Sequence, residues 1–256
     1  LPYAFQFWRA FSQWLGGISM IVLATSLLPL LGVGGMQLFK SEVSGPAIKR
    51  LSYRVSEISK RVWGLYILFT IILALLLLPV MSFFDAVSTA LATISTGGFS
   101  TRTDSLAAFD SVYVEVIVML FMIIGAINFN FLYQALILRN PKVFSKTVFK
   151  VFMAIMGVSI VVLTLALWRP VAEYFPPLQL TAPEYMMYPS FLDALRFASF
   201  QVVSVFTTTG FTNTDIHKWM PFTAFLLITL AMIGGMAGSS AGGIKILRLV
   251  LVAKQI

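Results

Sequence analysis

Two short stretches of the sequence share the same residue types in the same order. Neither contains a base, an acid or a metal-binding side chain, so their chemistry must come from threonine hydroxyls and from the backbone. Glycine permits backbone angles that direct successive carbonyl groups toward one axis. A ring of such carbonyls can replace the hydration shell of a monovalent cation. We therefore take as candidate cation ligands Thr96, Gly97, Gly98 and Phe99 of a first turn (residues 96–100) and Thr208, Thr209, Gly210 and Phe211 of a second turn (residues 208–212).

The two turns follow segments that resemble each other. Residues 83–101, FFDAVSTALATISTGGFST, align with residues 191–213, FLDALRFASFQVVSVFTTTGFTN. The distance from the aspartate to the Gly-Phe pair is four residues longer in the second copy, which is about one helical turn. The repeat therefore predicts a short helix before each turn, at about residues 84–95 and about residues 191–207.

An aspartate stands at the expected start of each short helix, Asp85 in the first copy and Asp193 in the second. An acid there caps free N–H groups and complements the helix dipole, whose negative end then points toward the turn and favours a cation. Arg196 is three positions after Asp193 on the same helix face, so we expect these two to pair. Arg102 and Asp104 are expected to pair or to be solvated at the outer mouth. The phenylalanines of both turns should pack behind them as braces.

A second candidate site is the run GGMAGSSAGG at residues 234–243, called here the interrupted segment. Its five glycines disfavour a helix by roughly 1 kcal/mol each relative to alanine. Non-helical backbone at membrane depth must line a cavity, although small residues can also serve close helix packing. The lysine that follows could repel cations, or it could extend to the cytoplasmic headgroups. The candidate gate residues are Gly234, Gly235, Gly238, Ser239, Ser240, Gly242, Gly243 and Lys245.

The composition indicates an integral membrane protein rather than a soluble domain. Hydrophobic residues make up 59% of the chain and charged residues 11%, whereas soluble domains have about half and a quarter. The sequence contains no cysteine, its single histidine has no partner at ligand spacing, and no base lies near the serine pair of the interrupted segment. These features argue against a polytopic membrane enzyme, which would need acid, histidine or metal-ligand clusters. We expect no enzyme activity and no cofactor in this chain.

Charge-free segments predict where the chain crosses the membrane, because about 18 apolar residues suffice to span it as a helix. Two further segments, 86–101 and 197–214, are too polar to face lipid and are expected to be re-entrant. The five predicted spans cover residues 10–39, 62–84, 116–138, 151–168 and 219–244.

The loops between the predicted spans differ in charge. Residues 40–61 and 139–150 are rich in lysine and arginine, whereas the opposite side holds most of the acids. The positive-inside rule places the basic loops in the cytoplasm. The net charge of +8 therefore reflects membrane orientation, and nucleic acid is not an expected partner.

The repeat divides the chain into units. Residues 1–40 are expected to be the last helix of a first unit, and 41–60 a basic cytoplasmic loop. Residues 61–147 and 148–256 are expected to be complete second and third units, each with a membrane helix, a short helix, a turn and a second membrane helix. The similarity of MIIGA at 122–126 to MIGGM at 232–236 supports this division.

Four stretches together resemble the membrane subunit of Trk-type bacterial potassium transporters, in the Trk/Ktr/HKT superfamily. They are QWLGGISMIVLATSLLPLLGVGGMQLFKSEVSGP, STGGFST, TTTGFTNTD and GGMAGSSAGGIK. The resemblance implies an all-α membrane fold with four helix–pore-helix–helix units around a pseudo-fourfold pore, of which this chain holds units two and three complete. The chain is accordingly expected to be a fragment.

The resemblance also implies a function and partners. It implies potassium uptake across the bacterial inner membrane by a multi-pass protein surrounded by lipid, with the two turns as quarters of a selectivity filter and the interrupted segment as an intramembrane gate. It further implies a homodimer with a cytosolic nucleotide-binding regulatory subunit. One alternative is a sodium-conducting or sodium-coupled member of the superfamily, which a serine in place of Gly98 or Gly210 would favour. Another is a non-conducting fragment or scaffold subunit.

Overall fold

A computed structural model of the chain describes residues 1–23, 46–169 and 186–255. The described residues are mostly helical, and the strands β1 (Ile233–Gly234) and β2 (Ile244–Lys245) contain two residues each. The α-helices are α1 (Tyr3–Val22), α4 (Pro46–Leu77), α5 (Phe83–Ile94), α6 (Val112–Ala126), α7 (Phe129–Leu136), α8 (Thr147–Leu167), α10 (Phe191–Phe206), α11 (Pro221–Met232) and α12 (Ile246–Gln255). The 3₁₀ helices are η2 (Ser105–Phe109), η3 (Pro141–Ser145) and η5 (Ile216–Lys218).

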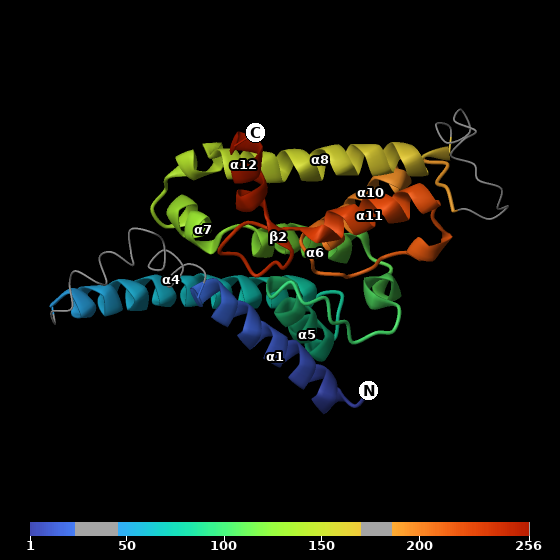
Figure 1. Ribbon diagram of the computed structural model, residues 1–256. Helices are drawn as coiled ribbons and strands as arrows, with labels where there is room; N and C mark the ends of the chain where they lie inside the picture. Colours follow the sequence, from blue (N-terminus) through green and yellow to red (C-terminus); the bar gives the residue numbers. More distant parts are fainter. Residues whose placement is uncertain (24–45, 170–185, 256) are drawn as a thin grey trace.

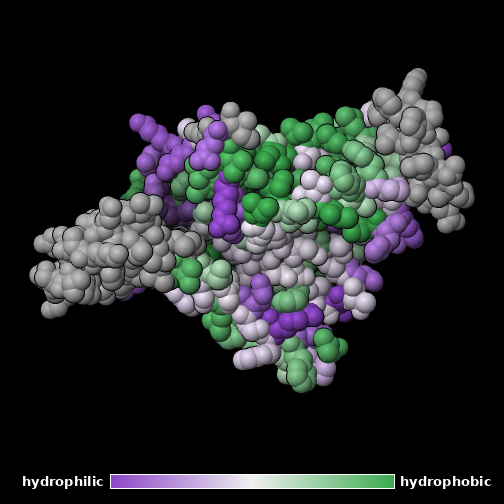
Figure 2. Space-filling model, viewed as in Figure 1, coloured by the Kyte–Doolittle hydropathy of each residue, from purple (hydrophilic) through white to green (hydrophobic). Residues whose placement is uncertain are grey.

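In Figure 1 the long helices α4 and α8 run side by side with α6, α10 and α11 between them, whereas α1 and α5 lie on the other side of α4. Within the described part of the chain, Ser59–Leu77 of α4 and all of α8 are long and apolar enough to cross a membrane alone. Figure 2 shows hydrophobic residues gathered on the side where α8 lies. This surface is the one expected of helices that face lipid tails.

The predicted third span, residues 116–138, is not a single helix, which corrects the sequence-based expectation. Helices α6 and α7 meet at an angle of 105° and together could form one broken span or a re-entrant loop. The break has a local cause at Asn128, whose Oδ1 accepts hydrogen bonds from the N–H groups of Asn130 (2.8 Å) and Phe131 (3.2 Å). Asn128 thus caps the N-terminus of α7, and the chain starts a new helix there.

The predicted fifth span is interrupted where the glycines predict it. Helix α11 ends at Met232 and α12 begins at Ile246. Between them, Ile233 pairs with Ile244 and Gly234 with Lys245 in a parallel two-stranded ladder. This ladder joins the two ends of the interrupted segment. The predicted first span begins earlier than expected, at Tyr3, and its residues after position 23 lie outside the described part of the chain.

Both predicted short helices are present, as α5 and α10. Each follows a serine that precedes the aspartate by three residues, and the Oγ of Ser82 accepts the N–H of Asp85 at the start of α5 (3.2 Å). Helix α10 packs on α8, where the rings of Phe206 and Phe152 stack with centroids 5.1 Å apart. Buried apolar residues surround both short helices, and this core fixes the positions at which the two turns begin.

Candidate functional site

The two turns close the short helices with the same hydrogen bonds. In the first turn, the N–H of Thr96 donates to Thr93 O (3.0 Å) and the N–H of Gly97 to Ala92 O (2.7 Å). In the second turn, the N–H groups of Thr208 and Thr209 donate to Val205 O and Ser204 O, both at 2.9 Å. This is the Schellman arrangement, in which the residue after the helix adopts a left-handed conformation. The sequence repeat therefore corresponds to a repeat of backbone geometry.

Left-handed backbone recurs at alternate residues in both turns. The angle φ is +50° at Thr96 and +67° at Gly98, and it is +58° at Thr208 and +86° at Gly210. Glycine adopts this conformation without steric cost, whereas a β-branched residue rarely does so. Threonine in this region costs about 1–3 kcal/mol and persists only where its surroundings hold it. The alternation changes the orientation of successive peptide groups within each turn.

The two turns lie in direct contact. A Cβ atom added to Gly98 would lie 1.8 Å from the carbonyl oxygen of Thr209 and 3.3 Å from the carbonyl carbon of Gly210. No larger residue fits at position 98 unless the second turn moves. The structure therefore brings Gly98 of the first turn against Thr209 and Gly210 of the second, more than 110 positions later in the sequence.

A buried carboxylate holds the outer end of the first turn against its short helix. Asp85 accepts hydrogen bonds from Thr101 Oγ1 (2.5 Å), Arg102 Nη2 (2.9 Å) and Ser82 Oγ (2.9 Å). Burial alone would raise the pKa of Asp85, but these hydrogen bonds and the positive charge of Arg102 lower the pKa below its ordinary value. Arg102 therefore pairs with Asp85 and not with Asp104, which was one of the two alternatives that the sequence left open.

Different residues hold the second turn in place. Ser204 Oγ donates to Phe211 O (2.6 Å), and Gln201 Nε2 donates to Asn213 Oδ1 (3.1 Å), so α10 is tied to the residues on both sides of Thr212. Phe211 is fully buried, as expected for a brace. Phe99 of the first turn is partly exposed and lies 4.6 Å beneath the guanidinium of Arg9 in α1.

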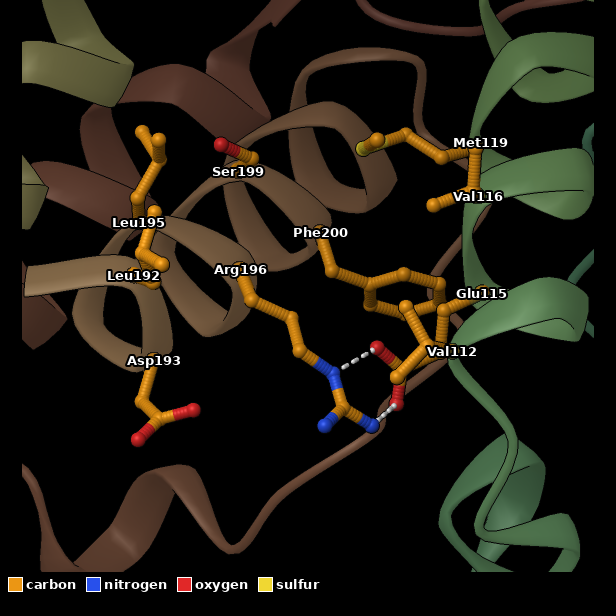
Figure 3. Close-up of a pocket in the computed structure, with 10 residues that line it drawn as sticks. All are labelled: Val112, Glu115, Val116, Met119, Leu192, Asp193, Leu195, Arg196, Ser199 and Phe200. Carbon is orange, nitrogen blue, oxygen red and sulfur yellow. Dashed lines mark hydrogen bonds and ion pairs between the residues drawn. The ribbon is translucent and has the colours of Figure 1, made fainter. Parts of the chain in front are cut away.

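An ion pair joins the second unit to the third at one end of α10. Arg196 donates to both carboxylate oxygens of Glu115 in α6, at 2.7 and 2.8 Å (Figure 3). The pair lines a cavity of about 440 Å³ between α6 and α10, whose other lining residues include Asp193 and Phe200. The expectation that Arg196 pairs with Asp193 is therefore wrong. Its partner is 81 residues away in the sequence and close in space.

The interrupted segment (234–243) lies directly against the end of α5 and the second turn. Ser240 Oγ donates to Ile94 O at the end of α5 (2.8 Å), and the N–H of Gly242 donates to Thr208 Oγ1 (2.6 Å). Lys245 Nζ donates to Ala241 O, so the half-buried lysine binds the segment itself. The predicted gate residues and the predicted cation ligands therefore belong to one site.

The candidate cation ligands at this site are backbone groups. In residues 1–23, 46–169 and 186–255, no three His, Asp or Glu side chains come together as a metal site. Asn128 is part of the site but was not among the predicted residues. It follows a long apolar run, and its only sequence signal was a helix-capping residue type at that position.

Comparisons with known proteins show the family to which the chain belongs. A family model described as TrkH, cation transport protein, matches residues 1–256, the whole chain. The Trk system potassium uptake proteins TrkH and TrkG of Escherichia coli K12 are 39% and 30% identical to this chain over 258 residues. In each case the match includes 100% of this chain and 50% of the relative, so the chain spans about half the length of these relatives.

A solved structure is similar over the same extent. The crystal structure of the potassium transporter TrkH from Vibrio parahaemolyticus matches with a TM-score of 0.81 and 36% identity. The match covers 100% of this chain and 49% of that one. It confirms the expected all-α membrane fold.

Proposed function

We start from the fact that this chain belongs to the TrkH family of cation transport proteins, and we propose that it forms part of a pathway for potassium uptake across the bacterial inner membrane. One observation carries the proposal: two turns with left-handed backbone at alternate residues lie against each other at the ends of two short helices. The turns supply carbonyl oxygens, and the negative ends of the helix dipoles favour a cation beside them.

In this proposal, potassium exchanges hydration water for carbonyl oxygens of the two turns and of equivalent turns elsewhere in the full-length protein. The side-chain network behind the turns keeps these oxygens at fixed positions. Asp85 and Ser204 each bind both a short helix and the chain beyond its glycine, so neither turn can relax independently of its helix. No bond to the ion is made or broken covalently, so the proposal needs no catalytic residue and no cofactor.

The interrupted segment serves as the gate in this proposal. Hydrogen bonds from Ser240 to Ile94 O and from Gly242 to Thr208 Oγ1 support this role, because they hold the segment beside the ends of both short helices. Lys245 is bound to the segment and puts positive charge close to the proposed pathway. Flux then requires the segment to move aside.

The wider assembly is also a proposal. We expect a homodimer, because family resemblance implies it, and a cytosolic nucleotide-binding regulatory subunit that contacts the basic face. A sodium-conducting protein remains the alternative function. The two glycines at positions 98 and 210 favour potassium over that alternative.

The test is rubidium uptake by potassium-starved cells that express the full-length protein. Gly98→Ser introduces a side chain where the carbonyl of Thr209 lies, so we expect the ratio of rubidium to sodium uptake to fall by about tenfold, the effect of roughly 1.4 kcal/mol. Gly157→Ser in α8 is the matched control, because a Cβ atom at that position meets nothing within 4 Å.

Two results would count against the proposal. Absence of rubidium uptake by the parent protein would contradict the potassium pathway. Rubidium uptake with the same preference over sodium in the Gly98→Ser variant would contradict the role of the first turn.

A further inference from the structure

The break between α6 and α7 lies directly against the interrupted segment. Residues 125–129 of the second unit and residues 236–240 of the third are joined by five hydrogen bonds. We propose that this break is a receptor that holds the interrupted segment in its blocking position, with Asn128 as the positioning residue. The inference rests on the proposed gate and identifies what keeps that gate shut.

The break provides the backbone groups that the segment uses. In a continuous helix the N–H of Phe129 would donate to Gly125 O, four residues earlier. Here the N–H of Phe129 donates to Gly238 O (3.0 Å), and Gly125 O accepts from the N–H of Ser240 (3.2 Å). The single hydroxyl proton of Ser240 is shared between Gly125 O (2.9 Å) and Ile94 O (2.8 Å). Ala126 O accepts from the N–H of Met236 (2.9 Å). A straight second-unit helix would leave the segment without these partners.

Asn128 contributes through both ends of its side-chain amide. Its Oδ1 caps α7 and so maintains the break, while its Nδ2 donates to Ala237 O in the interrupted segment. The Asn128 side chain therefore both maintains the break between α6 and α7 and binds the interrupted segment. These two roles can be separated by substitution, because a serine can cap a helix but lacks the amide donor.

The fit between segment and receptor depends on small residues. A Cβ atom added to Gly235 of the segment would lie 2.8 Å from Ala126 O, and one added to Gly125 would lie 3.4 Å from Ser240 Oγ of the segment. Release of the segment would expose the carbonyl groups of residues 125 and 126 and the N–H of Phe129. Unpaired backbone groups away from water are costly, so the segment leaves only when water enters the pathway.

The experiment compares two variants of the full-length protein in liposomes, using rubidium efflux and thiol labelling. Ala237→Cys provides the thiol, and its reaction rate with a water-soluble methanethiosulfonate reports whether the segment is docked. In this background, Asn128→Ser removes the donor to Ala237 O and keeps the cap. We expect both efflux and labelling to increase by about two- to tenfold, the shift that loss of one net hydrogen bond produces.

Two further variants calibrate the result. Asn130→Ala is the matched control, since the Asn130 side chain is exposed on the same helix and the segment bonds to Asn128 and Phe129 instead. The efflux rate and the labelling rate should both stay unchanged. Deletion of residues 238–241 removes the docked part of the segment. The efflux rate of this variant is the reference value for a protein without a gate.

The outcomes separate the inference from the proposed function. Equal rates in the Asn128→Ser and Asn130→Ala variants, with raised efflux after the deletion, would overturn the receptor and leave the gate standing. Unchanged efflux after the deletion would contradict the gate itself. Labelling needs no ion flux, so faster labelling of Asn128→Ser would support the receptor even in a protein that carried no rubidium.

Discussion

Threonine rather than glycine occupies the first left-handed position of each turn. Thr208 uses its hydroxyl oxygen to accept the N–H of Gly242, and Thr96 Oγ1 donates to Ser95 O (2.7 Å). Glycine would remove the backbone strain of about 1–3 kcal/mol but would also remove these hydrogen bonds. In the second turn, the strained residue Thr208 is thus the one that binds the interrupted segment.

Asp85 gives a prediction on pH dependence. Its pKa is lowered on folding, so its contribution to stability is complete above the ordinary carboxyl pKa of about 3.9 and is lost as the pH falls through the lower folded-state pKa. Stability should therefore be insensitive to Asp85 protonation between pH 7 and 5. Asp85→Asn should lower the free energy of unfolding at pH 7 by about 1–3 kcal/mol, because hydrogen bonds to a charged group are lost.

The measurement is the thermal unfolding midpoint of the detergent-solubilised protein from pH 7 to pH 3. The difference between parent and Asp85→Asn should shrink only below about pH 4. Asp104→Asn, at an exposed residue of the same outer loop, is the control and should have no effect at either end of the range. A difference that stays constant down to pH 3 would contradict the role of the ionised carboxylate.

At the scale of elements, the short helices are held by different partners in the two units. Helix α5 lies against α1 and α4, whereas α10 lies against α8 and is tied to α6 by Arg196 and Glu115. That ion pair connects α10, the short helix of the third unit, to the second unit. Its position near the outer start of α10 makes it a constraint on where the second turn sits.

Removal of Glu115 should destabilise the protein because Arg196 would remain partly buried without its partner. We expect Glu115→Ala to lower the free energy of unfolding by about 3 kcal/mol, the low end for a buried pair since Arg196 keeps 28% of its side-chain exposure. The double substitution Glu115→Leu and Arg196→Met should recover most of this loss. Denaturant unfolding in detergent measures both changes.

Glu57→Ala is the control for this prediction. Glu57 faces Lys60 and Arg61 at 3.9 and 3.8 Å in an exposed pair, and such pairs contribute about 0–1 kcal/mol. If the double variant is as unstable as Glu115→Ala, the loss comes from packing in the cavity and not from an unpaired charge.

The sequence predicted the short helices and the interrupted segment, because each has a local signal: a repeated acid-to-glycine spacing in one case and five glycines in the other. It did not predict the break at Asn128, because residues 116–138 form one uncharged run and a single capping residue is a weak signal within it. It also placed Arg196 against Asp193, since a partner 81 residues away leaves no spacing pattern. The roles of both turns in ion binding stay predictions.

At the scale of the whole molecule, the lysines of residues 142–150, at the start of α8, lie at the same end as α7 and α12 (Figure 1). By the positive-inside rule this end faces the cytoplasm. The loop that contains Asp104, between the first turn and α6, then faces outward.

This orientation can be tested by labelling the full-length protein in cells. A membrane-impermeant maleimide should react with Asp104→Cys from outside and with Lys142→Cys only after lysis, since both positions are exposed on loops. The parent without these substitutions measures background labelling. Reaction of Lys142→Cys in intact cells would reverse the topology and place the basic face outside.

The interrupted segment and the break at Asn128 occupy corresponding regions of two repeats whose turns share the same backbone geometry. A ring of four identical subunits must repeat every element four times. It cannot contain an interrupted segment in one unit and a break that binds it in another. Once the units are encoded separately within one chain, each can diverge. If the proposed gate is correct, divergence between the units allows a closure that acts from one side of the pathway, which strict rotational symmetry would forbid.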